Sequence, residues 1–287
     1  MINQEQIYSI SKQPSNLSVV IRCGRDRDGL QKCLDSIDES VEVVVGASED
    51  ATFVSDIMDH GYIVALHKYG NWSVAAENGL KASSYNDIII MDADSIFAPG
   101  AIHCINSALK AGHLLVQPHV EFKTNNSLGS KVVSKARSHE NLYTAKAFSP
   151  GLGLKRQELL HLIGVDGNIY HPKVMFGDDG YIDQKAQEAN IRVFVAKDAI
   201  IYHSAINLSH ELKNAFQFGR SEAQIEKVRN NNSGIWHQIV LSYFTKGAIE
   251  YYQQALDNYG LDTAMFATFW RMLYLVGYES ENYRHVK

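Results

Sequence analysis

The sequence of 287 residues has few cysteines, no excess of basic residues and no long apolar run. Its three cysteines, Cys23, Cys33 and Cys104, are too few for a disulfide framework and lack the spacing of a metal site. We therefore expect reduced thiols in a cytoplasmic protein. Lysine and arginine number 27 against 32 aspartates and glutamates, a net charge of −5 that leaves no general basic footprint for nucleic acid.

A membrane-spanning helix is not expected, because no stretch reaches roughly 18 apolar residues. Residues 1–14 are polar, so we expect no signal peptide. The most apolar stretch is 264–278, in which Arg271 is the only charged residue. It is interpreted either as a packed C-terminal helix or homodimer face, or as a helix lying on a membrane surface. The second alternative would place the protein peripherally at the inner face of the membrane, although such helices usually carry more lysine and arginine.

The first hundred residues alternate between short apolar runs, rich in valine and isoleucine, and segments with helical spacing of apolar residues. This pattern predicts a mostly parallel sheet with helices on both faces. Strands are expected at 17–22, 41–45, 62–66 and 88–91, and helices at 29–37, 52–58 and 73–83.

The pattern changes after Pro99. Helices are expected at 102–111, 157–163 and 181–190, and strands at 114–120, 192–195 and 199–202. Residues 123–145 are polar and either irregular or helical, and residues 149–154 are rich in glycine. From residue 210 the chain is expected to be helical to its end, with an asparagine-rich turn near 229–234. The best-supported domain boundary therefore lies near residue 205.

The strongest candidate site is Asp92-Ala93-Asp94, which directly follows the apolar run 88–91. In an extended chain, residues two apart face the same way, and open α/β sheets bind ligands beyond the carboxyl ends of their strands. Two carboxylates there can hold a divalent cation, which in turn can hold phosphate oxygens. The alternative is a polar exit from the strand with solvated acids.

Two weaker signals follow. Asp178 and Asp179, preceded by Phe176-Gly177, open a predicted helix, where the helix dipole favours an ionised general base, although one aspartate could equally serve as an N-cap. His203 ends an apolar strand and could be a metal ligand or a structural histidine.

The order of these motifs and the surrounding sequence resemble the family 2 glycosyltransferases, which have a GT-A fold. The matching segments are 18–21, 30–37, 42–45 with 48–52, 71–80, 92–94 with 99–101, 149–151, Arg156, 163–164 and 177–179. The resemblance covers roughly residues 17–204. It implies a GT-A domain over 1–204, with a Rossmann-like nucleotide half at 17–96, an acceptor half at 97–204 and a mixed central sheet. A helical C-terminal region would occupy 205–287.

The resemblance also implies an inverting transfer of a sugar, such as a hexose, from a nucleotide-diphosphate sugar to a hydroxyl acceptor in surface polysaccharide or glycan synthesis. The acceptor would be a glycan, a lipid-linked sugar or a small molecule. Asp94 and His203 would bind Mn²⁺ or Mg²⁺, and Asp92 the ribose or a metal-bound water. Asp179 matches the catalytic base, with Asp178 beside it. The segment containing Asn78 matches the helix that precedes the metal-binding strand, and Asn78 is assigned to the donor site.

Three departures from the family pattern concern the donor site. The Pro-Thr-Tyr-Asn-like segment after the first strand is Arg22-Cys23-Gly24-Arg25-Asp26 here. The aspartate that reads the base is replaced near Gly46, so Asp50 or Glu49 would substitute for it. Glu77 stands where a basic residue is common, so the positive charge would come from Arg25, Arg27 or Lys68.

Two other functions fit parts of the sequence. A sugar nucleotidyltransferase would need a glycine-rich basic loop soon after the first strand, which Gly24-Arg25-Asp26-Arg27-Asp28-Gly29 matches only weakly. The second alternative is a non-catalytic module that binds a nucleotide sugar or glycan. The missing base-reading aspartate favours this alternative slightly.

Overall fold

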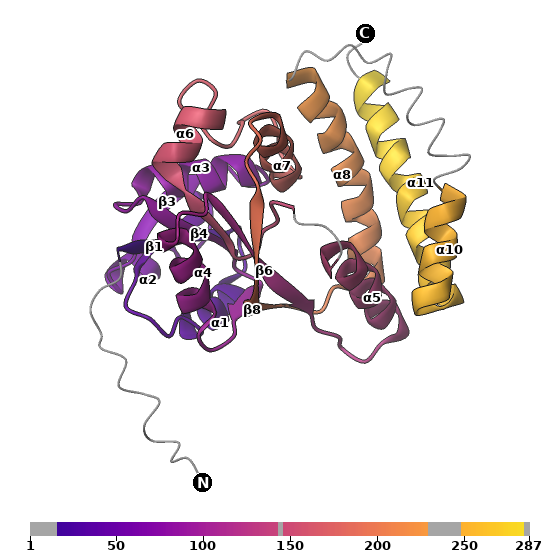
Figure 1. Cartoon of the computed structure of the whole chain (residues 1–287). Helices are drawn as coiled ribbons and strands as arrows, with labels where there is room; N and C mark the ends of the chain where they lie inside the picture. The colour runs from indigo at the N-terminus through magenta and orange to yellow at the C-terminus, as the bar shows by residue number, and fades with distance from the viewer. Residues whose placement is uncertain (1–15, 143–145, 229–247, 284–287) are drawn as a thin grey trace.

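The alternating strands and helices build an eight-stranded sheet in the computed structural model of the chain, which describes residues 16–142, 146–228 and 248–283 (Figure 1). The strand order is β3-β2-β1-β4-β7-β6-β8-β5. The strands are β1 (Leu17–Cys23), β2 (Glu42–Ser48), β3 (Ile63–His67), β4 (Asp87–Asp92), β5 (Ser95–Phe97), β6 (Leu115–Phe122), β7 (Leu152–Lys155) and β8 (Val193–His203).

The sheet is mixed, as the resemblance implied. β1 pairs in parallel with β2 and β4, and β2 with β3, which gives the expected parallel half. The glycine-rich segment forms β7, which lies antiparallel to both β4 and β6. The two strands expected at 192–195 and 199–202 are a single strand, β8, whose pairing with β6 shifts register between Pro118 and His119.

Alternate residues of the strands face two separate apolar cores. Val19 and Ile21 lie in the core that also contains residues of α1 (Arg27–Asp35), α2 (Val54–Asp59) and α4 (Ala101–Lys110). Val20 lies in the other core, together with residues of α3 (Trp72–Ala82), α6 (Arg156–Ile163) and α7 (Asp178–Glu188). Helices therefore cover both faces, as the alternation of strands and helices predicts.

The remaining helices stand to one side of the sheet (Figure 1). They are α5 (Leu128–Leu142), α8 (Leu208–Val228), α10 (Ala248–Tyr259) and α11 (Leu261–Tyr283). A small apolar cluster joins α5 to α11 through Val132, Val133 and Phe266, with Leu212 of α8 packed against it. The segment 123–145 thus contributes helix α5, and the apolar stretch 264–278 lies within α11.

The structure tests the membrane and domain predictions only in part. Within the described ranges, no helix combines the length and hydropathy needed to cross a bilayer. The boundary near residue 205 falls between the end of β8 and the start of α8. The division into 1–204 and 205–287 and the contacts of the C-terminal helices with a membrane or a second copy stay predictions. Residues 1–14 and the turn at 229–234 lie outside the described residues.

Candidate active site

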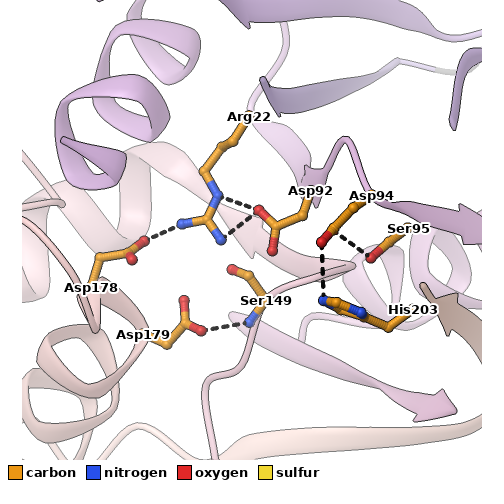
Figure 2. A network of polar contacts seen from close by, with 8 residues as sticks. All are labelled: Arg22, Asp92, Asp94, Ser95, Ser149, Asp178, Asp179 and His203. Atoms are coloured by element: carbon orange, nitrogen blue, oxygen red, sulfur yellow. Dashed lines mark hydrogen bonds and ion pairs between the residues drawn. The ribbon is translucent and has the colours of Figure 1, made fainter. Parts of the chain in front are cut away.

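The three motifs singled out in the sequence meet beyond the carboxyl ends of strands β4 and β8 (Figure 2). Asp92 is the last residue of β4 and lies directly opposite Arg22 of β1 in the parallel pairing. Asp94 follows two residues later, and His203, at the end of β8, pairs with Ser95 of β5. Asp178 and Asp179 come from the first turn of α7. Segments far apart in the sequence therefore bring their polar side chains together in one place.

Arg22 is the centre of this network, although its role was not predicted. Its Nε and Nη2 atoms lie 2.8 and 2.7 Å from Asp92 Oδ1, and its Nη1 donates to Asp178 Oδ2. The side chains of Arg22 and Asp178 are only 6% and 7% exposed. Burial lowers the pKa of Arg22, but Asp178 and Asp92 outweigh it and raise that pKa well above its usual value. A basic residue ending an otherwise apolar strand was the only sequence signal for this position.

The adjacent acids Asp178 and Asp179 have different partners. Asp178 forms the ion pair with Arg22, whereas Asp179 Oδ2 accepts a hydrogen bond of 3.1 Å from the backbone N–H of Ser149. The second oxygen of Asp179, Oδ1, is buried with no hydrogen-bond partner among the described residues. Burial, followed by the charge of Asp178, raises the pKa of Asp179 to about 8. Asp179 is therefore the acid whose proton is held near neutral pH.

Charge counting explains why one carboxyl of this network retains its proton. Asp92, Asp178 and Asp179 are three acids around the single guanidinium of Arg22, which forms ion pairs with the first two. Burial raises the pKa of both Asp92 and Asp178, and Arg22 opposes that effect. Like charges in a buried site disfavour joint ionisation, and Asp179 is the acid of the three that forms no ion pair with Arg22 among the contacts of the described residues.

Asp94 and His203 form a separate pair beside this network (Figure 2). Asp94 Oδ2 lies 3.5 Å from His203 Nε2. His203 Nδ1 lies 2.8 Å from the carbonyl oxygen of Ser204, which can only accept, so Nδ1 carries a hydrogen. In the neutral ring the lone pair of Nε2 then faces the carboxylate. Such an arrangement suits a cation between the two groups, and a second hydrogen bond that fixes the tautomer is typical of histidine ligands.

The pair does not by itself complete a metal centre. Over the residues that the structure describes, no group of three or more histidine, cysteine, aspartate or glutamate side chains gathers in a metal-binding arrangement. Asp94 is 46% exposed on its side chain, so a ligand from solvent can reach it. Carboxylate oxygen and imidazole nitrogen together suit Mn²⁺, and the carboxylate suits Mg²⁺.

Apart from Asp92, the residues assigned to the donor site lie elsewhere along the same sheet. Arg25 and Asp50 form an exposed ion pair after β1 and β2. Asn78 donates to the carbonyl oxygen of Leu66 at 2.8 Å, which ties α3 to β3. Neither the pair nor Asn78 contacts the Arg22 network through any hydrogen bond between described residues, and their role in donor binding stays a prediction.

Two departures from the family pattern have structural explanations. Glu77 is buried, and its Oε2 accepts from the backbone N–H groups of Ile169 and Tyr170 at 2.9 and 3.0 Å. It therefore fixes the loop that leads toward α7. A Cβ atom on Gly46 would lie 3.1 Å from the carbonyl oxygen of Ala75 in α3, so the close packing of helix on strand leaves little room for an aspartate there.

Comparisons with known proteins concern the fold. No protein-family model and no curated protein matches the chain. The mannosyltransferase PcManGT from Pyrobaculum calidifontis, solved with GDP-Man and Mn²⁺, aligns with a TM-score of 0.55 and 14% identity over 96% of this chain and 90% of its own. S. aureus TarS 1–349, solved with UDP-GlcNAc, aligns with a TM-score of 0.51 and 12% identity over 94% and 92%.

A longer S. aureus TarS structure aligns with a TM-score of 0.49 and 15% identity, and the match covers 76% of this chain but only 43% of that one. At these identities a likeness establishes the arrangement of helices and strands and no more. Together with the mixed sheet, the two alignments that span nearly the whole chain show that it has a GT-A fold followed by a C-terminal helical region.

Proposed function

We propose that this chain is a glycosyltransferase that moves a sugar from a nucleotide-diphosphate sugar to a hydroxyl acceptor, with inversion and with the help of a divalent cation. One observation carries the proposal: Asp94 with His203, and Asp179 with the Arg22 network, lie together beyond the carboxyl ends of strands β4 and β8 (Figure 2). Two structures with the same fold were solved with GDP-Man and UDP-GlcNAc, which supports a nucleotide-sugar donor.

Asp94 and His203 would hold Mn²⁺ or Mg²⁺. When bound, the cation would neutralise charge on the diphosphate leaving group. Because the described part of the chain gathers no third histidine, cysteine, aspartate or glutamate beside these two groups, phosphate oxygens and water would fill the remaining coordination positions. Asp92, which Arg22 holds in place, would contact the ribose or a metal-bound water.

Asp179 would act as the general base. The acceptor hydroxyl transfers its proton to the Asp179 carboxylate while its oxygen bonds to the anomeric carbon of the sugar. The bond from that carbon to the diphosphate oxygen breaks, and its electron pair leaves with the nucleoside diphosphate. A carboxyl with a pKa of about 8 is suited to this step, because a general base works best when its pKa lies near the operating pH.

Asp178 would not compete for this role, because its ion pair with Arg22 occupies it. We further propose that the transferred sugar is a hexose and that the pathway is surface polysaccharide or glycan synthesis. The acceptor would be a glycan, a lipid-linked sugar or a small molecule. The site would work in the cytoplasm or at the inner face of the membrane.

Release of nucleoside diphosphate from a panel of UDP- and GDP-sugars, with water as the default acceptor, tests the proposal. We expect release with Mn²⁺ or Mg²⁺, little with a chelator, and a loss of at least about tenfold in Asp94→Asn, in line with losses at metal sites. Asp56→Asn, an exposed carboxylate paired with Arg27, is the control.

Binding of UDP or GDP with equal affinity in the presence and absence of chelator would contradict the metal site. Release of pyrophosphate from a nucleoside triphosphate and a sugar phosphate would instead indicate a nucleotidyltransferase. Tight donor binding with no release under any condition would indicate a binding module.

A further inference from the structure

The segment that leads into the two aspartates of α7 is held between two helices. We call residues 175–177 the base loop. On one side, the backbone N–H of Trp72 in α3 donates to the carbonyl oxygen of Met175 at 3.3 Å. On the other side, the backbone N–H of Met175 donates to the side-chain Oε1 of Gln224 in α8, also at 3.3 Å. The base loop therefore has a fixed point on each of two elements.

An aromatic contact adds to the hold of α8 on the base loop. The rings of Phe176 and of Phe218 in α8 meet edge to face, with centroids 4.9 Å apart and planes at 64°. A Cβ atom on Gly177 would lie 3.4 Å from Ser221 Cβ and 3.6 Å from Phe218 Cδ1, so α8 stands about one methyl group away from the loop backbone. Every residue of the base loop thus has α8 beside it.

The first turn of α7, which carries both aspartates, depends on this loop. Gly177 is the N-cap residue of α7 and has no side chain that could bond to the first turn. Asp178 and Asp179 begin the helix directly after it. A shift of the base loop therefore moves both carboxylates relative to Arg22 and Ser149, their partners on other elements. The contacts that hold the base loop also set the position of the proposed base.

The ring of Phe218 is itself held by side chains of α5, α8 and α11. Its centroid lies 6.2 Å from that of Trp270 in α11, and the guanidinium carbon of Arg137 in α5 lies 5.2 and 5.8 Å from the two rings. Glu211, which is 1% exposed, joins these groups: its Oε1 accepts from Trp270 Nε1 at 2.8 Å and lies 2.5 Å from Arg137 Nη2. Three helices outside the sheet therefore fix the ring that contacts the base loop.

We propose that Phe218 is a positioning residue for the general base Asp179, an inference that rests on the proposed function. Through Phe176 it holds the base loop against α3, and with the loop it holds the first turn of α7. Phe218 acts through this contact and not by touching the substrate. Because a displacement of about 1 Å at a reacting group can cost on the order of 10²-fold in rate, the C-terminal helices form part of the catalytic unit.

The metal-binding pair lies apart from this contact. Asp94 lies between β4 and β5, and His203 ends β8. Among the described residues, no hydrogen bond or ion pair joins either of them to α8. Loss of the Phe218 ring should therefore slow the chemical step and leave the affinity for nucleotide and metal unchanged.

Release of nucleoside diphosphate in the presence of Mn²⁺, with water as acceptor, tests this proposal beside calorimetric titration of UDP or GDP, whichever the wild type binds. Phe218→Ala should lower kcat by about 10²-fold and leave Kd unchanged. Phe218→Leu, which keeps most of the apolar volume, should retain most of kcat. Phe266→Ala removes the same side chain from the cluster between α5 and α11 and is the matched control. It should lower the melting temperature but leave kcat unchanged below that temperature.

Phe176→Ala removes the same contact from the loop side and decides the question if Phe218→Ala does not fold. It should lower kcat to a similar extent. The variant that combines both changes should lose no more than either alone, because each change removes the same contact.

An active wild type whose kcat survives Phe176→Ala would overturn the positioning role and leave the proposed function standing. The same holds if Phe266→Ala loses as much kcat, or if Phe176→Ala weakens nucleotide binding as much as it lowers kcat. Wild-type protein that releases no nucleoside diphosphate from any donor would overturn both proposals.

Discussion

At the scale of single residues, the environment separates two chemically identical neighbours. Asp178 is paired with the buried guanidinium of Arg22, whereas Asp179 contacts only a backbone N–H among its described hydrogen bonds. The ion pair with Arg22 opposes the rise that burial causes in the pKa of Asp178. Asp179 is left with a raised pKa and an unpartnered oxygen, the properties expected of a group that exchanges a proton with a substrate.

The pKa of about 8 predicts how activity depends on pH. Only the ionised form of Asp179 can accept a proton, so kcat/KM should rise with pH and reach half its maximum near pH 8. Asp179→Asn should reduce the rate by about 10²–10⁴-fold while it still binds UDP and Mn²⁺. Asp178→Asn should lose less activity and more stability. Steady-state kinetics and melting curves of both variants check this, and the reverse pattern would make Asp178 the base.

The same raised pKa affects stability with a definite sign. An acid whose pKa is higher in the folded than in the unfolded protein binds more protons when folded, so its contribution stabilises at low pH and is lost as pH rises through about 8. Between pH 5 and 8 the melting temperature of the wild type should therefore fall more than that of Asp179→Asn. Parallel curves for the two proteins would contradict the raised pKa.

At the scale of elements, two glycines allow α8 and α11 to approach each other closely. A Cβ atom on Gly219 would lie 1.7 Å from the carbonyl oxygen of Tyr274, and one on Gly277 would lie 2.0 Å from that of Phe216. These are backbone atoms, which cannot rotate away as the end of a side chain can. The two helices thus pack backbone against backbone at these points, and any larger residue would force them apart.

Gly219→Ala should therefore destabilise the protein by about 1–3 kcal/mol or more, the usual cost of overpacking. Gly180→Ala in α7 is the matched control, because the nearest atom to its added methyl group would be 3.9 Å away. Gly180 lies in the first turn of α7, where replacing glycine by alanine at an uncrowded position should raise stability by at most about 1 kcal/mol. Chemical denaturation of both variants measures the difference, and equal midpoints would show that the two helices can separate freely.

At the scale of the whole molecule, α8 joins the C-terminal helices to the sheet. Ile225 is 1% exposed and lies in the same apolar core as residues of α3, α6 and α7. Gln224 Oε1 accepts from the backbone N–H of Met175 at 3.3 Å, and Glu222 Oε1 accepts from Gln184 Nε2 at 3.0 Å. These contacts cross the boundary expected near residue 205, so the two regions share part of one core.

We therefore predict a single cooperative transition for the whole chain in calorimetry. Ile225→Ala should lower the free energy of unfolding by about 2–5 kcal/mol and shift that transition as a whole. Met265→Ala, at a position of α11 that is 60% exposed, should change it by less than about 0.5 kcal/mol. Two transitions, of which Ile225→Ala moves only one, would instead show that 1–204 and 205–287 unfold independently.

The sequence by itself located most of the elements and the acids and histidine of the candidate site. Runs of valine and isoleucine give β1, β2 and β4, and the period of apolar residues gives α3 and α4, because these signals are local. Asp92, Asp94 and His203 could be singled out because each stands at or just past the end of an apolar strand. Such patterns depend only on neighbours along the chain.

Only the tertiary structure decided how these groups act on one another. Arg22 contacts Asp92 and Asp178 across separations of 70 and 156 residues, so no local pattern reveals that it distinguishes Asp178 from Asp179. The three-residue strand β5 is too short to show a periodic pattern, and Gly153 disfavours a strand in the four-residue β7, so both depend on the hydrogen bonds that neighbouring strands offer. Pairing, burial and shared charge are properties of the assembled sheet, since they arise only when distant segments meet.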